Sequence, residues 1–318
     1  MQPVAINRTK FTLIFAALVL VWAIFPAFAS RHVIDLFIFA GLYTIAGLGV
    51  SYLLGQCGIV NLAQSVFYGI GAYSVAYFTA QHGLPSIVAF AAGALISATI
   101  ALAVGWPVLR LSGHFLALAT LALAVIGQVL FLEWDWLTGG TLGIGGLPKL
   151  SLLGWQLNTP QRFYYLVWPI AALVMWLNYN LIHSRNGLAM RAMRDAPDAA
   201  AVAGVEIHPL KVQMFMLSAI LGSLAGSLFA HYVGFISVDS FGIDRSINFL
   251  LLAVLGGVNT TWGPALGALF VTLVPELLSR FGEIHAVLFA VTLVIAVVYL
   301  PQGLGGAIEQ WLWKKSST

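Results

Sequence analysis

Long apolar stretches without any ionisable side chain run through most of this chain. No Asp, Glu, Lys or Arg occurs from Leu36 to Leu109, and none occurs from Ser246 to Pro275. A membrane-spanning helix needs about 20 apolar residues, so each stretch must hold more than one helix. The pattern predicts ten spans: 11–28, 33–54, 61–80, 86–109, 115–132, 163–183, 212–233, 246–258, 262–279 and 285–300.

The first and the eighth predicted spans depart from a simple crossing. The run from Phe11 to Phe28 follows Arg8 and Lys10 as in a signal peptide. It is long for a signal peptide and further spans follow at once, so we expect a retained helix. The eighth span, 246–258, is too short to cross the bilayer untilted. We expect it to be a re-entrant or broken helix, or to merge with the ninth span.

Composition supports the same class of protein. Of the 318 residues, 60% are hydrophobic and only 8% are charged, whereas charged residues make up about 25% of an ordinary soluble domain. So few charges cannot cover the surface of a soluble protein of this size. We therefore predict an all-α integral membrane protein of about ten transmembrane helices, which forms a single domain over residues 1–318.

The Lys and Arg residues indicate how the spans are oriented. With the N-terminus inside and ten alternating spans, nine of the 14 Lys and Arg residues fall inside and five fall outside. Because Lys and Arg are enriched on the cytoplasmic side of membrane proteins, we predict that both termini are cytoplasmic. Residues 133–162 then form an outside loop, and residues 184–211 form an inside loop.

Several classes of function lack the residues that they need. The single cysteine, Cys57, excludes a disulfide within the chain and a cysteine-based zinc site. No phosphate-binding P-loop motif occurs, and the seven histidines are dispersed without metal-ligand spacing. The Lys and Arg residues are mostly scattered, whereas nucleic-acid binding needs clustered positive charge. An intramembrane enzyme would need a reactive cluster at membrane depth, and the sequence predicts none.

The sequence places no Asp, Glu, Lys or Arg near the middle of the membrane. A proton relay or a voltage sensor depends on such charges. An ion-coupled secondary transporter would also need an acidic residue within the membrane, together with inverted repeats. We therefore expect an energy source outside the spans, and a path that does not bind its cargo by charge.

Polar side chains gather in the third predicted span. Asn61, Gln64 and Tyr68 are spaced three and four residues apart, which places them on one face of a helix. Polar side chains are unfavourable in lipid, so this face is expected to look into the bundle or into a water-filled path. Two interpretations stay open: the three residues form hydrogen bonds between helices, or they line a translocation path.

Small residues recur at helical spacing in two other spans. Gly222 and Gly226 form one pair four residues apart, and Gly263 and Gly267 form another. Such pairs let two helices approach closely. They predict tight packing of the bundle, or helices that slide past one another during transport.

The inside loop is the most charged part of the chain. Its Ala-rich pattern with spaced arginines favours helix, and Pro197 is a residue that starts or kinks one. We predict two short helices, with Asp195 near the cap of the second and Pro197 in its first turn. Two interpretations stay open: this element docks into a groove on a cytosolic partner, or it is a solvated loop with ordinary positive-inside charge.

Four stretches resemble the permeases of branched-chain amino-acid ABC importers of the LivM type, and the resemblance covers nearly the whole chain. They are GQCGIVNLAQ (55–64) with FYGIGAY (67–73), PVLRLSGHFLALATL (107–121), LTGG (137–140) with Gly143 and Ile144, and the inside loop with LGGVNTTWGP (255–264) and PQGL (301–304). Together these stretches are specific for the family, although each alone is weak.

The resemblance implies a role and a set of partners. It implies a transport subunit rather than an enzyme, in the bacterial inner membrane, with no cofactor of its own. A second related permease, two cytosolic ATP-binding subunits that hold ATP and Mg²⁺, and a periplasmic substrate-binding protein would complete the importer. Relatives carry branched-chain amino acids, whereas similar permeases carry urea, short amides or aromatic acids, so the substrate stays open.

The resemblance also assigns residues to coupling with the ATPase. Leu188 stands where many relatives carry Arg, so one expected charge is missing from this loop. The predicted coupling residues are Arg185, Gly187, Arg191, Arg194, Asp195, Ala199, Ala200 and Gly204. The predicted path residues remain Asn61, Gln64 and Tyr68.

Overall fold

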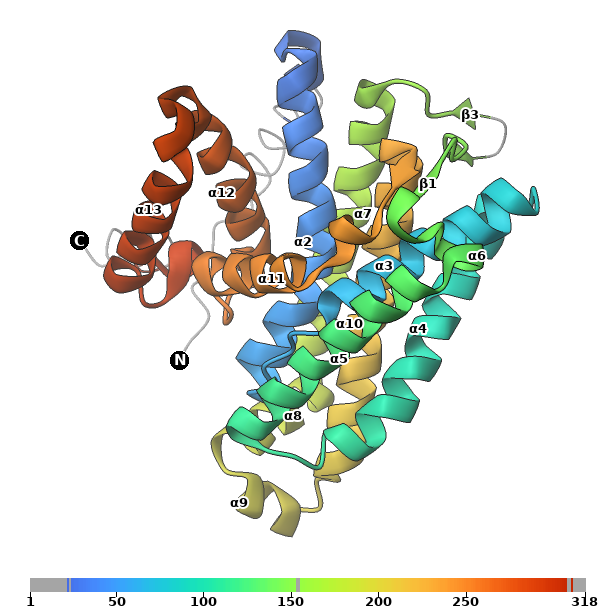
Figure 1. Ribbon diagram of the computed structural model, residues 1–318. Helices are drawn as coiled ribbons and strands as arrows, with labels where there is room; N and C mark the ends of the chain where they lie inside the picture. The colour runs from blue at the N-terminus through green and yellow to red at the C-terminus, as the bar shows by residue number, and fades with distance from the viewer. Residues whose placement is uncertain (1–21, 23, 153–154, 308–309, 311–318) are drawn as a thin grey trace.

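The protein is a bundle of helices that places its two long loops at opposite ends. The computed structural model describes residues 22, 24–152, 155–307 and 310. Figure 1 shows α8 and α9 of the predicted inside loop at one end, and β1, β3 and α6 of the predicted outside loop toward the other. The two loops are therefore on opposite sides of the bundle, as the alternation of spans requires.

Helices of very different length make up the bundle. The longest are α2 (Arg31–Cys57), α4 (Ser86–Val108), α5 (Gly113–Glu133), α7 (Pro160–His183) and α10 (Ile207–Val233). The shorter ones are α3 (Gln64–Ser74) with its π-helical continuation η1 (Val75–Gln81), α6 (Asp135–Thr138), α8 (Arg185–Asp195), α9 (Pro197–Val202), α11 (Ile243–Gly256), α12 (Gly263–Leu278) and α13 (His285–Tyr299). Three 3₁₀ turns are η2 (Gly140–Leu142), η3 (Val238–Phe241) and η4 (Ser279–Ile284).

The all-α membrane class is confirmed, but the count of about ten spans is not. Within the described residues, six helices are long and apolar enough to cross a membrane. The predicted spans 61–80, 246–258 and 285–300 are not among them, because α3 passes into a π-helix and α11 and α13 have only 14 and 15 residues. Most of the predicted first span, 11–28, lies outside the described residues.

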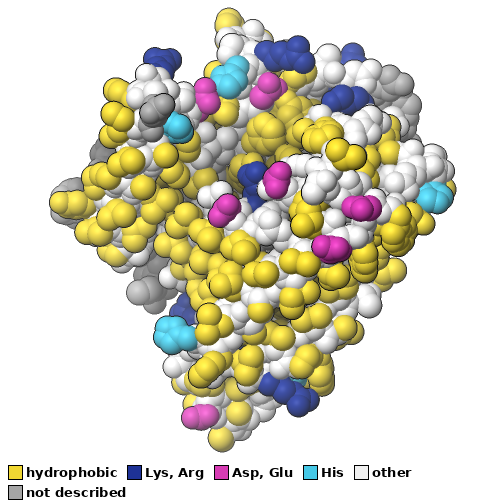
Figure 2. All heavy atoms as spheres, in the orientation of Figure 1, with side chains coloured by type: hydrophobic (Ala, Val, Ile, Leu, Met, Phe, Trp, Pro, Cys, Tyr) yellow, Lys and Arg dark blue, Asp and Glu magenta, His cyan; other side chains and the backbone are white. Residues whose placement is uncertain are grey.

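Two helices form the centre of the bundle. In both α2 and α10, 67% of the most apolar 18-residue window is buried, against 17–28% in the other four candidate spans. Figure 1 shows α2 between α12 on one side and α7 on the other. Hydrophobic side chains cover much of the outer face in Figure 2, as expected for a surface that meets lipid. A displacement of α2 would therefore shift the helices that pack against it, which include α7, α10 and α12.

Both glycine pairs bring two backbones together. A Cβ on Gly226 of α10 would lie 1.8 Å from the carbonyl oxygen of Tyr68 in α3. A Cβ on Gly267 of α12 would lie 1.8 Å from the carbonyl oxygen of Leu252 in α11. The prediction of tight packing is confirmed at both places. The sliding of these helices stays a prediction.

A glycine separates α2 from α3. Gly58 adopts a left-handed φ of 68° and ends α2, and its N–H donates to the carbonyl of Leu54 at 3.2 Å. The chain then turns back, and Asn61 Oδ1 accepts a hydrogen bond from Ala63 N at 2.9 Å. Helix α3 begins only at Gln64. Asn61 therefore precedes the helix on which the spacing had placed it.

The outside loop is ordered by short strands. Strand β1 (Ile144–Gly145) pairs antiparallel with β4 (Phe235–Ile236), which follows α10. Strands β2 (Ser151–Leu152) and β3 (Trp155–Gln156) pair as a hairpin. The pairing of β1 with β4 fixes the loop against the segment that leads from α10 into α11.

Helix α11 starts inside the bundle rather than at its end. Ser246 in its first turn accepts a hydrogen bond from Ser65 N at 2.9 Å and donates to Ser65 Oγ at 2.8 Å. Ser65 follows Gln64, whose amide donates to the carbonyl of Ala46, near the middle of α2. The expectation of a short or broken helix at 246–258 is confirmed. Merging with the ninth span is not observed, because residues 257–262 separate α11 from α12.

Candidate functional site

The inside loop folds into the two short helices that its sequence predicts. Ser184 is the N-cap of α8, and its Oγ accepts a hydrogen bond from Gly187 N at 3.4 Å. Asp195 is the last residue of α8, and Ala196 is the N-cap of α9. Pro197 occupies the first turn of α9, where the missing N–H of proline does no harm.

Helix α8 is held against the bundle by its buried face. A Cβ on Gly187 would lie 2.0 Å from the carbonyl oxygen of Ile182 at the end of α7, so only glycine fits there. Met190 and Met193 are buried in an apolar cluster that also contains Cys57 from the end of α2. Helix α8 is therefore a packed element rather than part of a solvated tether.

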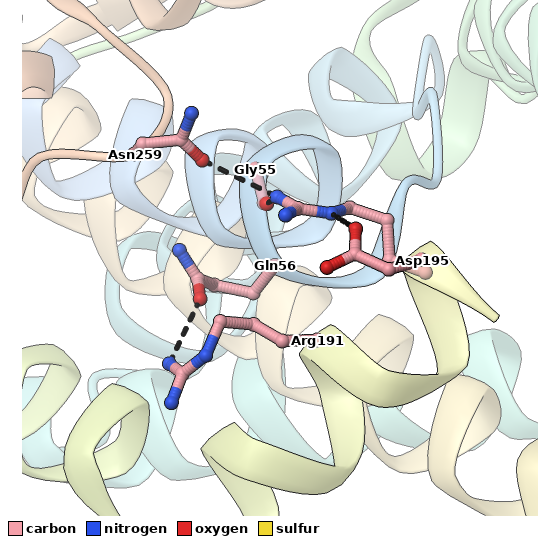
Figure 3. Close-up of polar contacts among 6 residues, drawn as sticks. Gly55, Gln56, Arg191, Asp195 and Asn259 are labelled. Atoms are coloured by element: carbon pink, nitrogen blue, oxygen red, sulfur yellow. Dashed lines mark hydrogen bonds and ion pairs between the residues drawn. The ribbon is translucent and has the colours of Figure 1, made fainter. Parts of the chain in front are cut away.

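Arg191 joins α8 to the ends of two long helices. Its Nη1 donates to Gln56 Oε1 at 3.3 Å (Figure 3) and also to the carbonyl of Ile182 at 2.9 Å. Gln56 lies in the last turn of α2, and Ile182 lies in the last turn of α7. Cations are favourable at helix C-termini, where backbone carbonyls lack intrahelical partners. Arg191 thus ties α8 to both helices.

Arg194 makes the second connection, between α8, α2 and the turn after α11. Its Nη1 donates to the carbonyl of Gly55 in the last turn of α2, and to Asn259 Oδ1 at 3.3 Å (Figure 3). Its Nε donates to Asp195 Oδ1 at 2.8 Å. This hydrogen bond from Arg194 lowers the pKa of the Asp195 carboxyl below its ordinary value. One guanidinium connects three segments of the chain.

The other predicted coupling residues lie elsewhere on the loop. Arg185, Ala199 and Gly204 are exposed, whereas Ala200 is buried. Gly204 has a φ of 86°, a conformation that favours glycine at the end of α9. The outward surface also presents apolar side chains, and Val202 on α9 is 91% exposed. The surface available to a partner thus combines small and apolar side chains with charged ones such as Arg185 and Asp195. Arg191 and Arg194 both donate hydrogen bonds to the permease, although Arg194 stays partly exposed.

Sequence reasoning missed two residues of this site. Gln56 and Asn259 receive the hydrogen bonds of Arg191 and Arg194, yet neither was assigned a role in coupling. Both lie in the motifs 55–64 and 255–264 that carry the family resemblance. That location was the available signal, but nothing in the spacing indicated that the two motifs meet the inside loop.

Gln64, one of the predicted path residues, forms hydrogen bonds between helices, and Asn61 bonds to it from the preceding turn. Gln64 Nε2 donates to the carbonyl of Ala46 in α2 and to the carbonyl of Ser218 in α10, each at 3.1 Å. Gln64 Oε1 accepts from Asn61 Nδ2 at 3.1 Å and from Ser218 Oγ at 3.0 Å. Asn61 and Gln64 are fully buried. The geometry is that of the interhelical interpretation, and a role in the path stays a prediction.

Tyr68, the third predicted path residue, lies among aromatic rings. Its ring centroid is 5.4 Å from that of Phe229 and 5.4 Å from that of Phe249. Its hydroxyl is buried and has no hydrogen-bond partner in the described part of the chain. A buried hydroxyl without a partner is uncommon. Tyr68 therefore differs from Asn61 and Gln64, whose polar groups are satisfied.

Arg245 lies against the middle of α2, against expectation. Arg245, placed outside by the sequence, donates from Nη1 to the hydroxyl of Tyr43 at 2.5 Å. Tyr43 is the thirteenth of the 27 residues of α2, close to its middle. The expectation of no charge at mid-membrane depth was wrong, because α11 begins inside the bundle and carries Arg245 in its first turn.

The comparisons with known proteins identify the family. Residues 32–298 match the model of the branched-chain amino acid transport system permease component. The chain belongs to this family of permeases. The matched residues include α8, α9, Arg245 and all the predicted path residues, so the geometry above is that of a permease component.

Individual relatives support the same assignment. The high-affinity branched-chain amino acid transport system permease proteins LivM of Salmonella typhimurium and of Escherichia coli are each 30% identical to this permease, over 94% of its length and 76% of theirs. The LivH permease protein of Escherichia coli is 25% identical over 84% of this chain and 92% of its own. No solved structure matches. The resemblance to LivM-type permeases is thus confirmed.

Proposed function

We propose that this permease is one membrane-spanning half of an ATP-binding-cassette importer for branched-chain or other amino acids. The observation that carries the proposal is the pair of arginines that join α8 to the end of α2 and to Asn259. An importer driven by separate ATPases needs an element that touches the spans on one side and a soluble subunit on the other. Helix α8 packs against the spans, and the exposed residues of α9 are available for a soluble subunit.

The relatives of this permease support one partner subunit, and the family resemblance implies the others. It is similar to both LivM and LivH, which supports pairing with a second, related permease. Two cytosolic ATP-binding subunits would bind ATP and Mg²⁺ and dock on the inside loops, and a periplasmic binding protein would deliver the substrate. The permease itself needs no cofactor in this scheme. It would lie in the bacterial inner membrane with both termini in the cytoplasm.

Alternating access is the mechanism that we infer for this complex. ATP binding closes the two ATPases, and the exposed residues Arg185, Ala199 and Gly204 move with them. Arg191 and Arg194 carry the movement to the C-terminal end of α2. Because α2 is central and deeply buried, its displacement biases the bundle between two arrangements. Gly187, Asp195 and Ala200 keep α8 and α9 in place during that step, and Asn61, Gln64 and Tyr68 line the path that changes its opening.

The first test is co-purification of the tagged permease from mild detergent, followed by mass spectrometry. We expect two ATP-binding proteins and a second permease in the complex. The binding protein encoded with them would then be screened against leucine, isoleucine, valine, urea, short amides and aromatic acids. A permease that purifies alone, and that drives uptake with an ion gradient after ATP depletion, would replace this proposal with an ion-coupled transporter.

A further inference from the structure

A cavity lies between α2, α11 and α12, around Arg245, whose side chain reaches the middle of α2. Its volume is about 240 Å³. Its polar lining is Tyr43, Arg245, Asn248 and Thr272, and its apolar lining includes Phe39 and Val271. Figure 2 shows the surface hollowed between α2 and the α12–α13 pair. The cavity therefore opens on the surface of this chain and combines one cationic end with apolar walls.

The position of the cavity is deep in the bundle. Tyr43 lies twelve residues from the start of α2, which corresponds to about 18 Å along the helix axis. A hydrocarbon core is about 30 Å thick, so this residue is near its centre when α2 spans the bilayer. The guanidinium of Arg245 is held at that depth by its hydrogen bond to Tyr43, with the carbon Cζ 5.3 Å from the ring centroid.

The charge of Arg245 has no anion to balance it. Among the described residues, no carboxylate lies within ion-pairing distance of its guanidinium. Its protein partners are the Tyr43 hydroxyl and the carbonyl of Ser240, which accepts from Nε at 3.3 Å. A cation at membrane depth is unfavourable unless it faces water or a ligand, and such residues commonly mark a transport path. The N-terminal end of α11 adds partial positive charge at the same place.

We propose that this cavity is the subsite of the transport path that binds the carboxylate of the cargo, through Arg245. The inference rests on the proposed function, since it takes an amino acid as the cargo. A guanidinium binds a carboxylate through paired N–H donors, and Asn248 and Thr272 border the same space. Phe39 and Val271 provide apolar surface for an aliphatic side chain. No acidic residue lines the cavity, so the ammonium group of the cargo is not recognised there.

The volume of the cavity fits a single small solute. Sites for drug-sized ligands occupy roughly 300–1,000 Å³, and the cavity of about 240 Å³ is smaller than that range. A branched aliphatic acid fits this description better than a peptide or a nucleotide. None of the residues that line the cavity lies in the inside loop, so substrate binding and coupling use different residues.

Ligand protection of an introduced cysteine tests the subsite directly. The native Cys57 is buried and is first replaced, Cys57→Ala, so that it cannot react. Thr272→Cys then places a thiol in the cavity wall, and its alkylation by N-ethylmaleimide is followed by mass spectrometry in the purified complex. We expect L-leucine and 4-methylpentanoate, which carry the carboxylate, to slow the reaction. Isopentylamine, which has the same chain and no carboxylate, is expected to give no protection.

Substitution of Arg245 gives a second, independent readout. In reconstituted complexes, Arg245→Gln is expected to lower leucine transport by about tenfold or more, the usual effect of losing one charge-assisted contact. ATP hydrolysis stimulated by the loaded binding protein is expected to persist, because α8 and α9 are untouched. Arg245→Lys keeps the charge and is expected to retain part of the transport. Protection by leucine disappears in Arg245→Gln if the carboxylate binds there.

Three results would overturn the subsite. They are equal protection by isopentylamine and leucine, no reaction of the introduced cysteine in the absence of ligand, and transport by Arg245→Gln at the wild-type rate. Each of these leaves the importer proposal intact. A wild-type complex that neither hydrolyses ATP nor transports leucine would instead overturn the proposed function. The protection experiment keeps Arg245 unchanged, so it decides the question even where Arg245→Gln does not fold.

Discussion

Arg194 Nη1 and Asn259 Oδ1 lie 3.3 Å apart, although 65 residues separate them in the sequence. The same nitrogen donates to the carbonyl of Gly55. Three segments therefore meet at one guanidinium: the inside helix α8, the end of the central helix α2, and the turn between α11 and α12. Helix α11 in turn carries Arg245 at its other end. This gives a continuous chain of contacts from the inside loop to the cavity.

We expect Arg194→Ala to uncouple ATP hydrolysis from transport. The side chain mainly contacts the permease itself, so partner docking survives while its movement no longer reaches α2. Coupling free energies of this kind are typically about 1–3 kcal/mol, so we expect roughly a tenfold loss of transport per ATP hydrolysed. The measurement compares leucine uptake with ATPase activity in proteoliposomes.

Arg110→Ala is the matched control for this experiment. Arg110 is also an exposed arginine at a loop, between α4 and α5, and it is far in sequence from α8 and α9. Its removal is expected to leave the ratio of uptake to ATP hydrolysis unchanged. Loss of the ATPases from the purified Arg194→Ala complex would contradict the inward role and support direct docking by Arg194.

Asn259→Ala is expected to reproduce part of the Arg194 effect. Residues that share one hydrogen-bond network show non-additive effects, with interaction energies of about 0.5–3 kcal/mol. The double variant Arg194→Ala with Asn259→Ala is therefore expected to lose little more coupling than Arg194→Ala alone. The cycle is measured as transport per ATP hydrolysed for the four proteins. Simple addition of the two single effects would show that the 3.3 Å contact carries no coupling.

Gly226→Ala is expected to disrupt the packing of α10 on α3. The new Cβ would lie 1.8 Å from the carbonyl oxygen of Tyr68, and a backbone atom cannot rotate away. Overpacking costs about 1–3 kcal/mol where side chains can adjust, so we expect at least that loss here, read as a lower thermal midpoint in detergent. Gly105→Ala is the control, because its Cβ would meet only side chains, those of Phe215 at 3.0 Å and Leu109 at 3.5 Å. Equal midpoints for the two variants would contradict the tight contact.

The sequence predicted the class of fold because helices that span a bilayer must be apolar, and this requirement shows in the composition. Runs without charge mark helices, and the boundaries of α4, α7 and α10 agree with the predicted spans within a few residues at most ends. The two helices of the inside loop followed from Ala, Arg and Pro197. These are local signals, which depend on residues within one or two turns of each other.

The sequence could not predict how deep each helix begins. An apolar half-helix such as α11 has the same composition as one that starts at the membrane surface. Arg245 was placed outside for that reason, yet the bond between Ser65 and Ser246 holds the start of α11 inside the bundle. The contacts of Arg191 and Arg194 with α2 were also missed, for a second reason. They join residues more than a hundred positions apart in the chain, and no single-sequence pattern encodes such pairs.

Gln64→Leu is expected to destabilise the permease by about 1–3 kcal/mol. The substitution removes the hydrogen bonds by which the Gln64 side-chain amide joins α2 to α10. It also leaves the buried Asn61 amide without its acceptor, and an unsatisfied buried donor costs about 1–3 kcal/mol. The measurement is the thermal midpoint of the purified protein. Ser97→Ala is the matched control, because the buried Ser97 hydroxyl has no partner in the described part of the chain. A Gln64→Leu protein with an unchanged midpoint but altered uptake of leucine against valine would assign Gln64 to the path instead of the interhelical contact.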